Sequence, residues 1–344
     1  MSTDPRARDD NLMERFEMEG LNRFSARQGV IAIAITGLLL VLSSGASIRT
    51  EGEEMDPGIG RDIVLGVGKP AGWLADKLPF AGAAHSLTAA VRESDAPDGA
   101  GFAAQTSVPE DKLPAIPPAP LDPPAAGDRP AEKRPLETLL VTGDSLSTPL
   151  DRELAGRLTP EGITVVPAPH LGTGISTGKF IDWGAVGPAQ VDEHHPDAVV
   201  VFIGAGEGDP MPGPEGLEVS CCGPDWTAVY AYRVRQLMNT YRQAGASQVF
   251  WLNVMTLREP DKQRVAEAVN QAIVAAARPW PDEVHPIDLG KVFTPGDRYR
   301  DAMQIDGSEQ IVRESDGIHL NKVGSGLAAE VVIDNLDDYF TIDP

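Results

Sequence analysis

Three residues of this sequence have the types that nucleophilic attack on an ester requires. Ser145 follows a short apolar run that ends in Gly-Asp, while Asp316 and His319 lie three positions apart near the end of the chain. A serine hydroxyl becomes a nucleophile when a histidine takes its proton and a carboxylate orients that histidine. We therefore predict that Ser145 is a nucleophile, His319 its base and Asp316 the orienting group.

The position of Ser145 decides between catalysis and a purely structural role. The stretch 139–145 is typical of a buried parallel strand that ends in a turn before a helix. Ligands of open α/β sheets bind at the carboxyl ends of strands, so a serine there is well placed. The simpler interpretation is that Asp144 or Ser145 only caps the next helix. The Asp-x-x-His pair favours catalysis, and the absence of Gly-x-Ser-x-Gly argues against an ordinary α/β-hydrolase.

The charge and the cysteine content of the sequence limit which macromolecules, metals and cofactors the protein could bind. The 344 residues carry a formal net charge of −22, which argues against nucleic-acid binding and against docking onto an anionic membrane surface. Cys221 and Cys222 are adjacent, which is neither a metal spacing nor a disulfide framework, so a bond between them and two free thiols both stay open. No cluster of histidine, cysteine and carboxylate has ligand spacing, and we predict no metal and no cofactor.

The first 135 residues divide into four segments. Residues 1–27 are polar, residues 28–48 carry no charge and are long enough to span a bilayer, residues 49–93 predict a membrane-proximal segment, and residues 94–135 are rich in proline and alanine. Arginines precede the apolar segment and glutamates follow it, which places the N-terminus in the cytoplasm. We expect a single-pass membrane anchor and an extended linker. A cleaved signal peptide is the alternative.

Residues 136–344 alternate between apolar strands and amphipathic helices. This pattern predicts a parallel sheet that is covered on both faces. The expected strands are 136–141, 163–167, 198–203, 248–254 and 284–287, and the expected helices are 150–158, 226–244, 261–277 and 323–339.

The motifs together resemble the SGNH hydrolases, also called GDSL-like lipases and esterases. The Gly-Asp-Ser run that ends at Ser145 matches the first block of that family, Gly172 or Gly174 the glycine of the second, and Asp316 to His319 the last. The segments between them resemble a membrane-anchored bacterial subgroup labelled DUF459. The resemblance implies a flavodoxin-like three-layer α/β/α sandwich. It also implies that the N–H groups of Ser145 and of Gly172 or Gly174 stabilise the oxyanion.

The third block departs from the family pattern Gly-x-Asn-Asp, whose asparagine donates to the oxyanion. If the block is aligned from Gly204, Gly206 takes the asparagine position and Glu207 the aspartate position; aligned from Gly206, these positions fall on Gly208 and Asp209. Either alignment loses the amide, and one such donor typically contributes a factor of about 10²–10³ to turnover.

Two functions follow as hypotheses. The first is an anchored extracytoplasmic serine esterase or O-acyltransferase, whose substrate is an acylated cell-envelope polysaccharide or a small acyl ester. The second is a degenerate domain that binds an envelope glycan or a protein partner without turnover. Among nearby residues, Asn253 is a substitute donor, His170 a candidate lining residue, and Arg313 either an anion ligand or a partner of a surface acid.

Overall fold

A computed structural model of the protein describes residues 101–117, 133–178, 180–243 and 248–342. The predicted cytoplasmic segment, transmembrane helix and membrane-proximal segment (1–93) lie outside these residues. Among the described residues, none of the helices combines the length and the hydropathy needed to cross a membrane.

The centre of the fold is a five-stranded parallel sheet with the order β3-β2-β4-β7-β8. Its strands are β2 (Thr138–Gly143), β3 (Thr164–Pro169), β4 (Ala198–Phe202), β7 (Gln248–Leu252) and β8 (Val284–Ile287). Counted along these five strands the order is 2-1-3-4-5, the flavodoxin-like form of a doubly wound sheet. The predicted α/β fold with a parallel sheet is confirmed.

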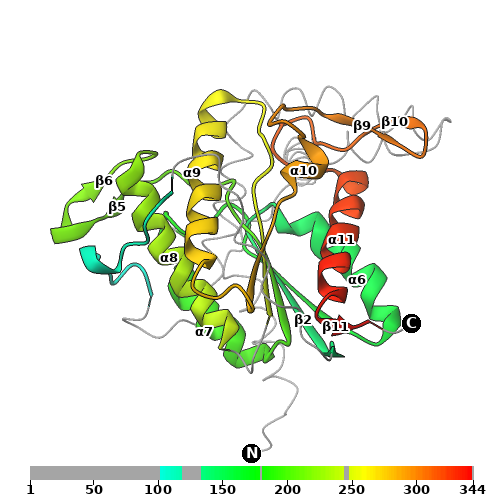
Figure 1. Ribbon diagram of the computed structural model, residues 1–344, viewed down its shortest axis with the longest axis horizontal. Coiled ribbons are helices and arrows are strands. Elements are labelled where there is room, and N and C mark those ends of the chain that lie inside the picture. Colours follow the sequence, from blue (N-terminus) through cyan, green and yellow to red (C-terminus); the bar gives the residue numbers. More distant parts are fainter. Residues whose placement is uncertain (1–100, 118–132, 179, 244–247, 343–344) are drawn as a thin grey trace, which may run out of the picture. The chain divides into compact units, whose positions relative to one another are not determined.

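Helices cover both faces of this sheet (Figure 1). Packed together on one face are α6 (Ser147–Leu158) and α11 (Lys322–Asp337), and on the other α7 (Trp183–His194), α8 (Pro224–Arg242) and α9 (Pro260–Ala277). Residues of β4 are buried throughout because helices cover it on both sides, which explains its run of apolar residues. Trp226, Tyr230 and Val234 of α8 point into the core at helical spacing.

The remaining elements are short. Two antiparallel pairs, β5 (Met211–Pro212) with β6 (Glu218–Val219) and β9 (Ala302–Ile305) with β10 (Ser308–Ile311), extend from the sandwich, and β1 (Arg134–Pro135) pairs with β11 (Phe340–Thr341). The others are α10 (Gly290–Phe293) and the 3₁₀ turns η2 (Glu110–Lys112), η3 (Thr159–Glu161) and η4 (Pro214–Gly216). The strands of these three pairs are not expected from the sequence, because each is two to four residues long and carries little periodicity.

The strand order reverses between β2 and β4. The chain leaves β2 through α6 on one face, and it leaves β3 through α7 on the other face before entering β4. Doubly wound sheets bind their ligands in the crevice that such a reversal opens at the carboxyl ends of the strands. The fold therefore brings the residues that follow β2 and β4 to the expected site.

Residues 101–117, which we call the strap, fold against this domain. Phe102 and Val108 are buried in the core cluster. The Asp182 carboxylate accepts hydrogen bonds from the N–H groups of Phe102 (2.7 Å) and Ala103 (2.6 Å), and it also caps α7 through Gly184 N (2.9 Å). The strap lies within the segment expected to be an extended linker (94–135). The difference arises because two apolar residues suffice to dock a segment whose composition is otherwise typical of a linker.

Removal of the Phe102 ring should destabilise the domain. Truncation of a buried phenylalanine to alanine typically costs about 3–5 kcal/mol, so we expect F102A to lower the free energy of unfolding by about 3 kcal/mol. Urea denaturation followed by tryptophan fluorescence measures this change. The control is S107A on the same strap, whose exposed side chain should contribute less than about 0.5 kcal/mol. Equal stability of F102A and the wild type would show that the strap is not part of the folded domain.

Candidate active site

The turn after β2 presents Ser145 at the carboxyl end of the sheet. Gly143 has a φ of +144°, and a Cβ there would collide with the carbonyl oxygen of Phe202, so glycine is required. The buried Asp144 carboxylate accepts hydrogen bonds from the N–H groups of Leu146 (2.9 Å), Gly204 (2.8 Å) and Ala205 (2.8 Å). Asp144 thus closes the turn and ties β2 to β4. The simpler interpretation of a helix cap is wrong, because α6 begins at Ser147 with Leu146 as its N-cap and no side chain caps it.

Ser145, His319 and Asp316 are brought together although 174 positions separate the serine from the histidine. The distance from Ser145 Oγ to His319 Nε2 is 2.7 Å, and that from His319 Nδ1 to Asp316 Oδ2 is 2.5 Å. Asp316 Oδ1 accepts from the N–H groups of Ile318 (2.8 Å) and His319 (3.1 Å). This is the hydrogen-bonded chain of nucleophile, base and orienting carboxylate that acyl transfer requires.

Two arginines hold the loop 314–319 that carries Asp316 and His319. Arg313 Nη1 donates to Ile318 O (2.7 Å) and Nη2 to Thr256 O (2.9 Å), while Arg258 Nη2 donates to Ser315 O (2.7 Å). The side chain of Arg313 is only 2% exposed. Both expectations for Arg313, an anion ligand or a partner of a surface acid, are therefore wrong: it binds backbone carbonyls instead.

The pKa values of Asp316 and His319 are shifted in opposite directions. Partial burial raises the pKa of Asp316, but the hydrogen bond and charge of His319 and the two N–H donors outweigh it, so the pKa falls to about 2. Burial lowers the pKa of His319, but the hydrogen bond and charge of Asp316 outweigh it, so the pKa lies above its usual 6.5. The pair stabilises a charged imidazolium, which is the state that His319 reaches when it takes a proton from Ser145.

The loop after β3 (residues 170–178, the second-block loop) contains both glycines expected to act as oxyanion donors. Gly174 is buried against the loop after β4, and a Cβ on it would lie 3.0 Å from the Glu207 carboxylate. Gly172 is exposed, with a φ of +71°. Gly174 therefore lies where the two loops meet, and Gly172 at the surface.

The loop after β4 (residues 204–209, the third-block loop) packs against the second-block loop through Gly206. A Cβ at position 206 would lie 2.5 Å from Thr173 O. Gly208 also contacts that loop, because its N–H donates to Ser176 Oγ (3.2 Å), but a Cβ there would face Val265 and Cys221 Sγ instead. The direction of a side chain at position 206, toward Thr173, favours the alignment that puts Gly206 at the family's asparagine position. An asparagine does not fit there without a shift of Thr173.

Glu207 does not present a free carboxylate. Its oxygens accept from the N–H groups of Ile175 (2.7 Å) and Ser176 (2.8 Å) and from Tyr230 Oη (2.9 Å). Burial raises the pKa of Glu207, although these donors lower it. A free carboxylate at this position would oppose the developing charge of an oxyanion, but Glu207 instead holds the second-block loop.

Two of the remaining candidates lie near the sheet's carboxyl edge. Asn253 does not act as a substitute donor, because its Nδ2 donates to Asp288 (2.7 Å) and its Oδ1 accepts from Leu289 N (2.8 Å). His170 begins the second-block loop and packs its ring edge against Trp183, with centroids 5.3 Å apart. Among the described residues, no group of histidine, cysteine and carboxylate side chains could hold a metal ion.

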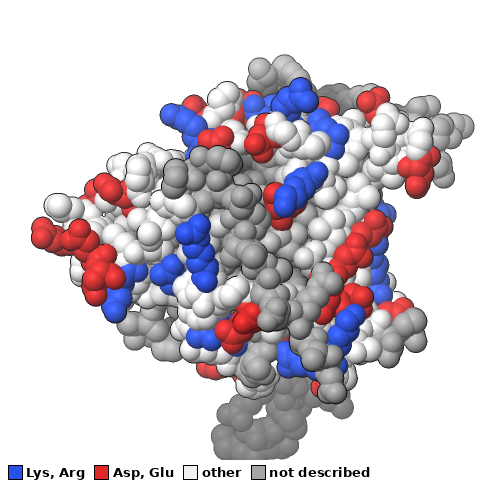
Figure 2. Space-filling view, viewed as in Figure 1, with Lys and Arg blue, Asp and Glu red and all other residues white. Residues whose placement is uncertain are grey.

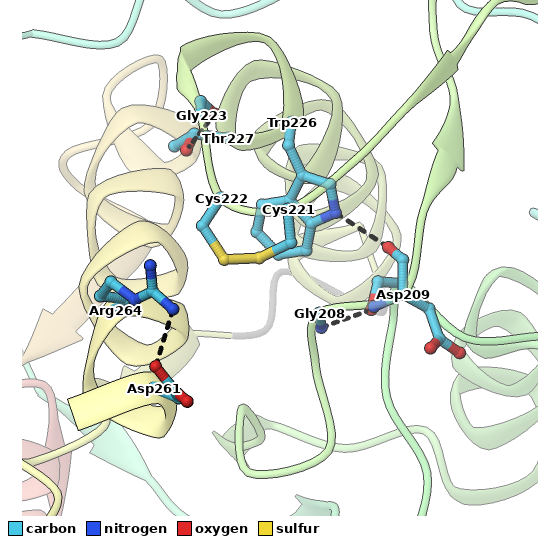
Figure 3. Close-up of a disulfide and its surroundings, with 10 residues drawn as sticks. Gly208, Asp209, Cys221, Cys222, Gly223, Trp226, Thr227, Asp261 and Arg264 are labelled. Atoms are coloured by element: carbon cyan, nitrogen blue, oxygen red, sulfur yellow. Dashed lines mark hydrogen bonds and ion pairs between the residues drawn. A yellow bond between two sulfur atoms is a disulfide. The ribbon is translucent and has the colours of Figure 1, made fainter. Parts of the chain in front are cut away.

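Cys221 and Cys222 form a disulfide with each other, which decides the alternative left open by the sequence. Figure 3 shows the bond between the start of α8 and α9, beside the exposed Asp261–Arg264 ion pair and close to Gly208. The neighbouring Trp226 donates from Nε1 to Asp209 O (2.9 Å). The disulfide thus lies against the end of the third-block loop.

A family model described as a protein of unknown function (DUF459) matches residues 138–335, which is more than half of the chain. The chain belongs to the DUF459 family. The match includes Ser145, Asp316 and His319 and confirms the resemblance inferred from the sequence motifs. A comparison with curated proteins gave no match.

Several solved structures are similar to this DUF459 protein. The C-terminal catalytic domain of peptidoglycan O-acetyltransferase A from Streptococcus pneumoniae is 12% identical, with 59% of this chain and 93% of that chain covered and a TM-score of 0.36. A catalytic mutant of an acetylxylan esterase from Geobacillus stearothermophilus is 12% identical (61% and 98% covered, TM-score 0.39). A family two carbohydrate esterase from Clostridium thermocellum is 14% identical (60% and 66% covered, TM-score 0.39).

Sequence reasoning missed three residues that position the site of this DUF459 protein: Arg258, Asp182 and Arg233. Arg258 holds the loop 314–319 that carries Asp316 and His319. Asp182 holds the strap, and Arg233 donates a hydrogen bond to Ile175 O (3.0 Å) in the second-block loop. Only Asp182 carried a signal, because an aspartate directly before an apolar helical segment is a helix-cap pattern.

The raised pKa of His319 can be tested directly by NMR. The imidazole should titrate with a midpoint above 6.5, because the Asp316 charge favours its protonated form. In D316N the Asp316 charge is gone while burial stays, so the pKa of His319 should be lower than in the wild type, where Asp144 and Glu314 contribute the remaining upward shift. The control H194A removes a histidine at the end of α7 and should leave the His319 midpoint unchanged. A wild-type midpoint at or below 6.5 would contradict the coupling.

Proposed function

We propose that this protein is a serine esterase or O-acyltransferase, with Ser145 as nucleophile, His319 as general base and acid, and Asp316 as the group that orients His319. The observation that carries the proposal is the continuous hydrogen-bonded chain from Ser145 Oγ through His319 to Asp316. A serine that only capped a helix would not need a histidine 2.7 Å from its hydroxyl.

The chemistry follows from this arrangement. Ser145 Oγ attacks the acyl carbon while His319 Nε2 takes the hydroxyl proton, and Asp316 stabilises the imidazolium that forms. The tetrahedral intermediate collapses when His319 returns the proton to the leaving alcohol oxygen, which leaves the acyl group on Ser145. Water or a sugar hydroxyl then attacks the acyl carbon, His319 takes its proton, and Ser145 is released with its proton restored.

The oxyanion donors in this proposal are the backbone N–H groups of Ser145 and of Gly174. Gly174 is preferred to Gly172 because it is buried at the junction of the second-block and third-block loops. The family's asparagine is absent, and Gly206 leaves no room for it beside Thr173. We therefore expect a working but slower enzyme than a relative with the amide, by up to the factor of about 10²–10³ that one donor contributes.

The substrate we propose is an acyl ester on a cell-envelope glycan, with the domain held outside the membrane by residues 28–48. The uncharged segment and its arginine-rich N-terminal flank support the anchor. On the face shown in Figure 2, Lys and Arg side chains are scattered among Asp and Glu. An uncharged glycan suits this mixed surface better than a polyanion, which requires a concentrated basic patch.

The nucleophile is tested by S145A together with a fluorophosphonate probe. The wild type should hydrolyse p-nitrophenyl acetate and bind the probe covalently at Ser145, and S145A should lose both, with turnover down by at least about 10³-fold. The control S147A removes a buried hydroxyl that donates to Asp144 O (2.8 Å), and it should keep the labelling. Mass spectrometry of the labelled peptide locates the modified residue.

Absence of labelling in a folded wild type would favour the second function, a glycan-binding domain without turnover. The missing third-block asparagine is the observation that keeps this function in view. Hydrolase and transferase are separated by product analysis: free acetate indicates transfer to water, and an acetylated saccharide formed in the presence of a chito-oligosaccharide acceptor indicates transfer to sugar.

The pH profile provides a further check. Attack by Ser145 requires neutral His319, so kcat/KM should fall as the pH drops through the raised pKa of His319 and should reach half its maximum above pH 6.5. Asp316, with a pKa of about 2, stays ionised throughout this range. A pH–rate profile from pH 4 to 9 with p-nitrophenyl acetate measures the midpoint. A midpoint near pH 4 would contradict the assignment of His319 as the base.

A further inference from the structure

A small hollow of about 200 Å³ lies between the strap and the second-block loop. Phe102 and Gln105 of the strap line one part of it, and Ile175 of the loop and Arg233 of α8 line another. Ile175 directly follows Gly174, which we propose as an oxyanion donor. The hollow is therefore adjacent to the proposed active site along the same loop.

Arg233 brings a buried and incompletely paired cation to this hollow. The residue is 5% exposed, its Cζ lies 5.3 Å from the centroid of the Phe102 ring, and Nη1 donates to Ile175 O (3.0 Å). Within the described part of the chain, its Nε is buried without an acceptor. A buried donor without a partner typically costs about 1–3 kcal/mol, so a ligand that accepts a hydrogen bond here is favoured.

Gln105 supplies a hydrogen-bond acceptor that complements the Nε donor of Arg233. Its Nε2 donates to Gln236 Oε1 (2.9 Å), whereas its Oε1 is buried and finds no donor among the described residues. Gln236 lies three positions after Arg233 on α8, so this bond places Gln105 about one helical turn from Arg233. Both atoms therefore belong to residues that line the hollow, and neither has a hydrogen-bond partner among the described residues.

The charge around Arg233 favours an uncharged ligand. Burial lowers the pKa of Arg233, and the carboxylates of Asp182 and Glu207 raise it, because both act on the guanidinium. Two carboxylates already balance this single cation, so an anionic ligand would add a third negative charge. Hydroxyl and amide groups, in contrast, are uncharged and supply both a donor and an acceptor.

We propose that the hollow is a subsite for one uncharged sugar residue of the glycan substrate, with Arg233 Nε donating to the sugar and Gln105 Oε1 accepting from it. The proposal rests on the proposed function in that it places a glycan beside Ser145. Phe102 and Trp183 also line the hollow but are almost wholly buried, so in this proposal the polar contacts of Arg233 and Gln105 carry the recognition. The volume is below the range of about 300–1,000 Å³ typical of drug-sized ligands, which fits a single residue.

Direct binding tests the subsite independently of catalysis. The probe is N,N′-diacetylchitobiose, titrated into the purified full chain by calorimetry, with S145A as the background. We expect Q105L to weaken binding about five- to tenfold, the effect of one lost hydrogen bond. The matched control is Q236L, which removes the same Gln105–Gln236 bond but no polar atom of the hollow, and which should bind as the parent does.

Equal losses in Q105L and Q236L would overturn the proposal, because they would show that only the position of the strap matters. Tighter binding of glucuronic acid than of glucose would overturn the charge argument. R233K, which keeps the charge but lacks Nε, should also weaken binding about tenfold, and its thermal unfolding midpoint shows whether it folds. Absence of chitobiose binding in the parent protein would exclude the subsite, whatever the outcome of the labelling at Ser145.

A kinetic comparison separates this proposal from the proposed function. For the Ser145 enzyme, Q105L should lower the ratio of kcat/KM for an O-acetylated chito-oligosaccharide to kcat/KM for p-nitrophenyl acetate about tenfold, mainly through KM. If p-nitrophenyl acetate is not hydrolysed but chitobiose binds, the proposed function fails and the subsite stands. An unchanged ratio in Q105L would overturn the subsite while leaving the esterase in place.

Discussion

The site depends on the buried carboxylate of Asp144. Three backbone N–H groups converge on it, from Leu146 in its own turn and from Gly204 and Ala205 after the neighbouring strand. A carboxylate buried at this depth is costly unless donors satisfy it, and N–H groups buried at this depth need acceptors in the same way. The carboxylate and the N–H groups satisfy one another. These hydrogen bonds fix the turn that carries Ser145 relative to the start of the third-block loop.

A second buried carboxylate extends this arrangement outward. Glu207, three residues after Gly204, accepts from Ile175 and Ser176 and so fixes the second-block loop against the third-block loop. The strap is held by Asp182, the N-cap of α7, and faces the same loop across a small hollow. The altered third block therefore has a structural role of its own: Gly206 lacks the side-chain amide, whereas Glu207, at the family's aspartate position, organises the loop bearing the proposed oxyanion donor.

The sequence predicted what depends on local pattern, and it missed what depends on tertiary contacts. Apolar runs bounded by glycine and proline placed all five strands of the main sheet, and the Gly-Asp-Ser and Asp-x-x-His spacings identified three side chains that the fold brings together. The partners of Asp144, Glu207 and Arg313 are backbone groups distant in sequence, which no residue pattern encodes. For Arg313 the sequence left two roles open, an anion ligand or a partner of a surface acid, and its two carbonyl acceptors are seen only in the folded chain.

The strap changes where this domain begins. The family match starts at residue 138, and the polar, proline-rich composition before it suggests a boundary there. A fragment cut at that boundary would lack the ring of Phe102 and would expose the N-terminus of α7, where Gly184 approaches the strap so closely that even a Cβ would not fit. Such a fragment would expose a hydrophobic surface that the strap covers in the full chain. Compounds selected against the fragment in an inhibitor screen would bind a face that is accessible only in the fragment.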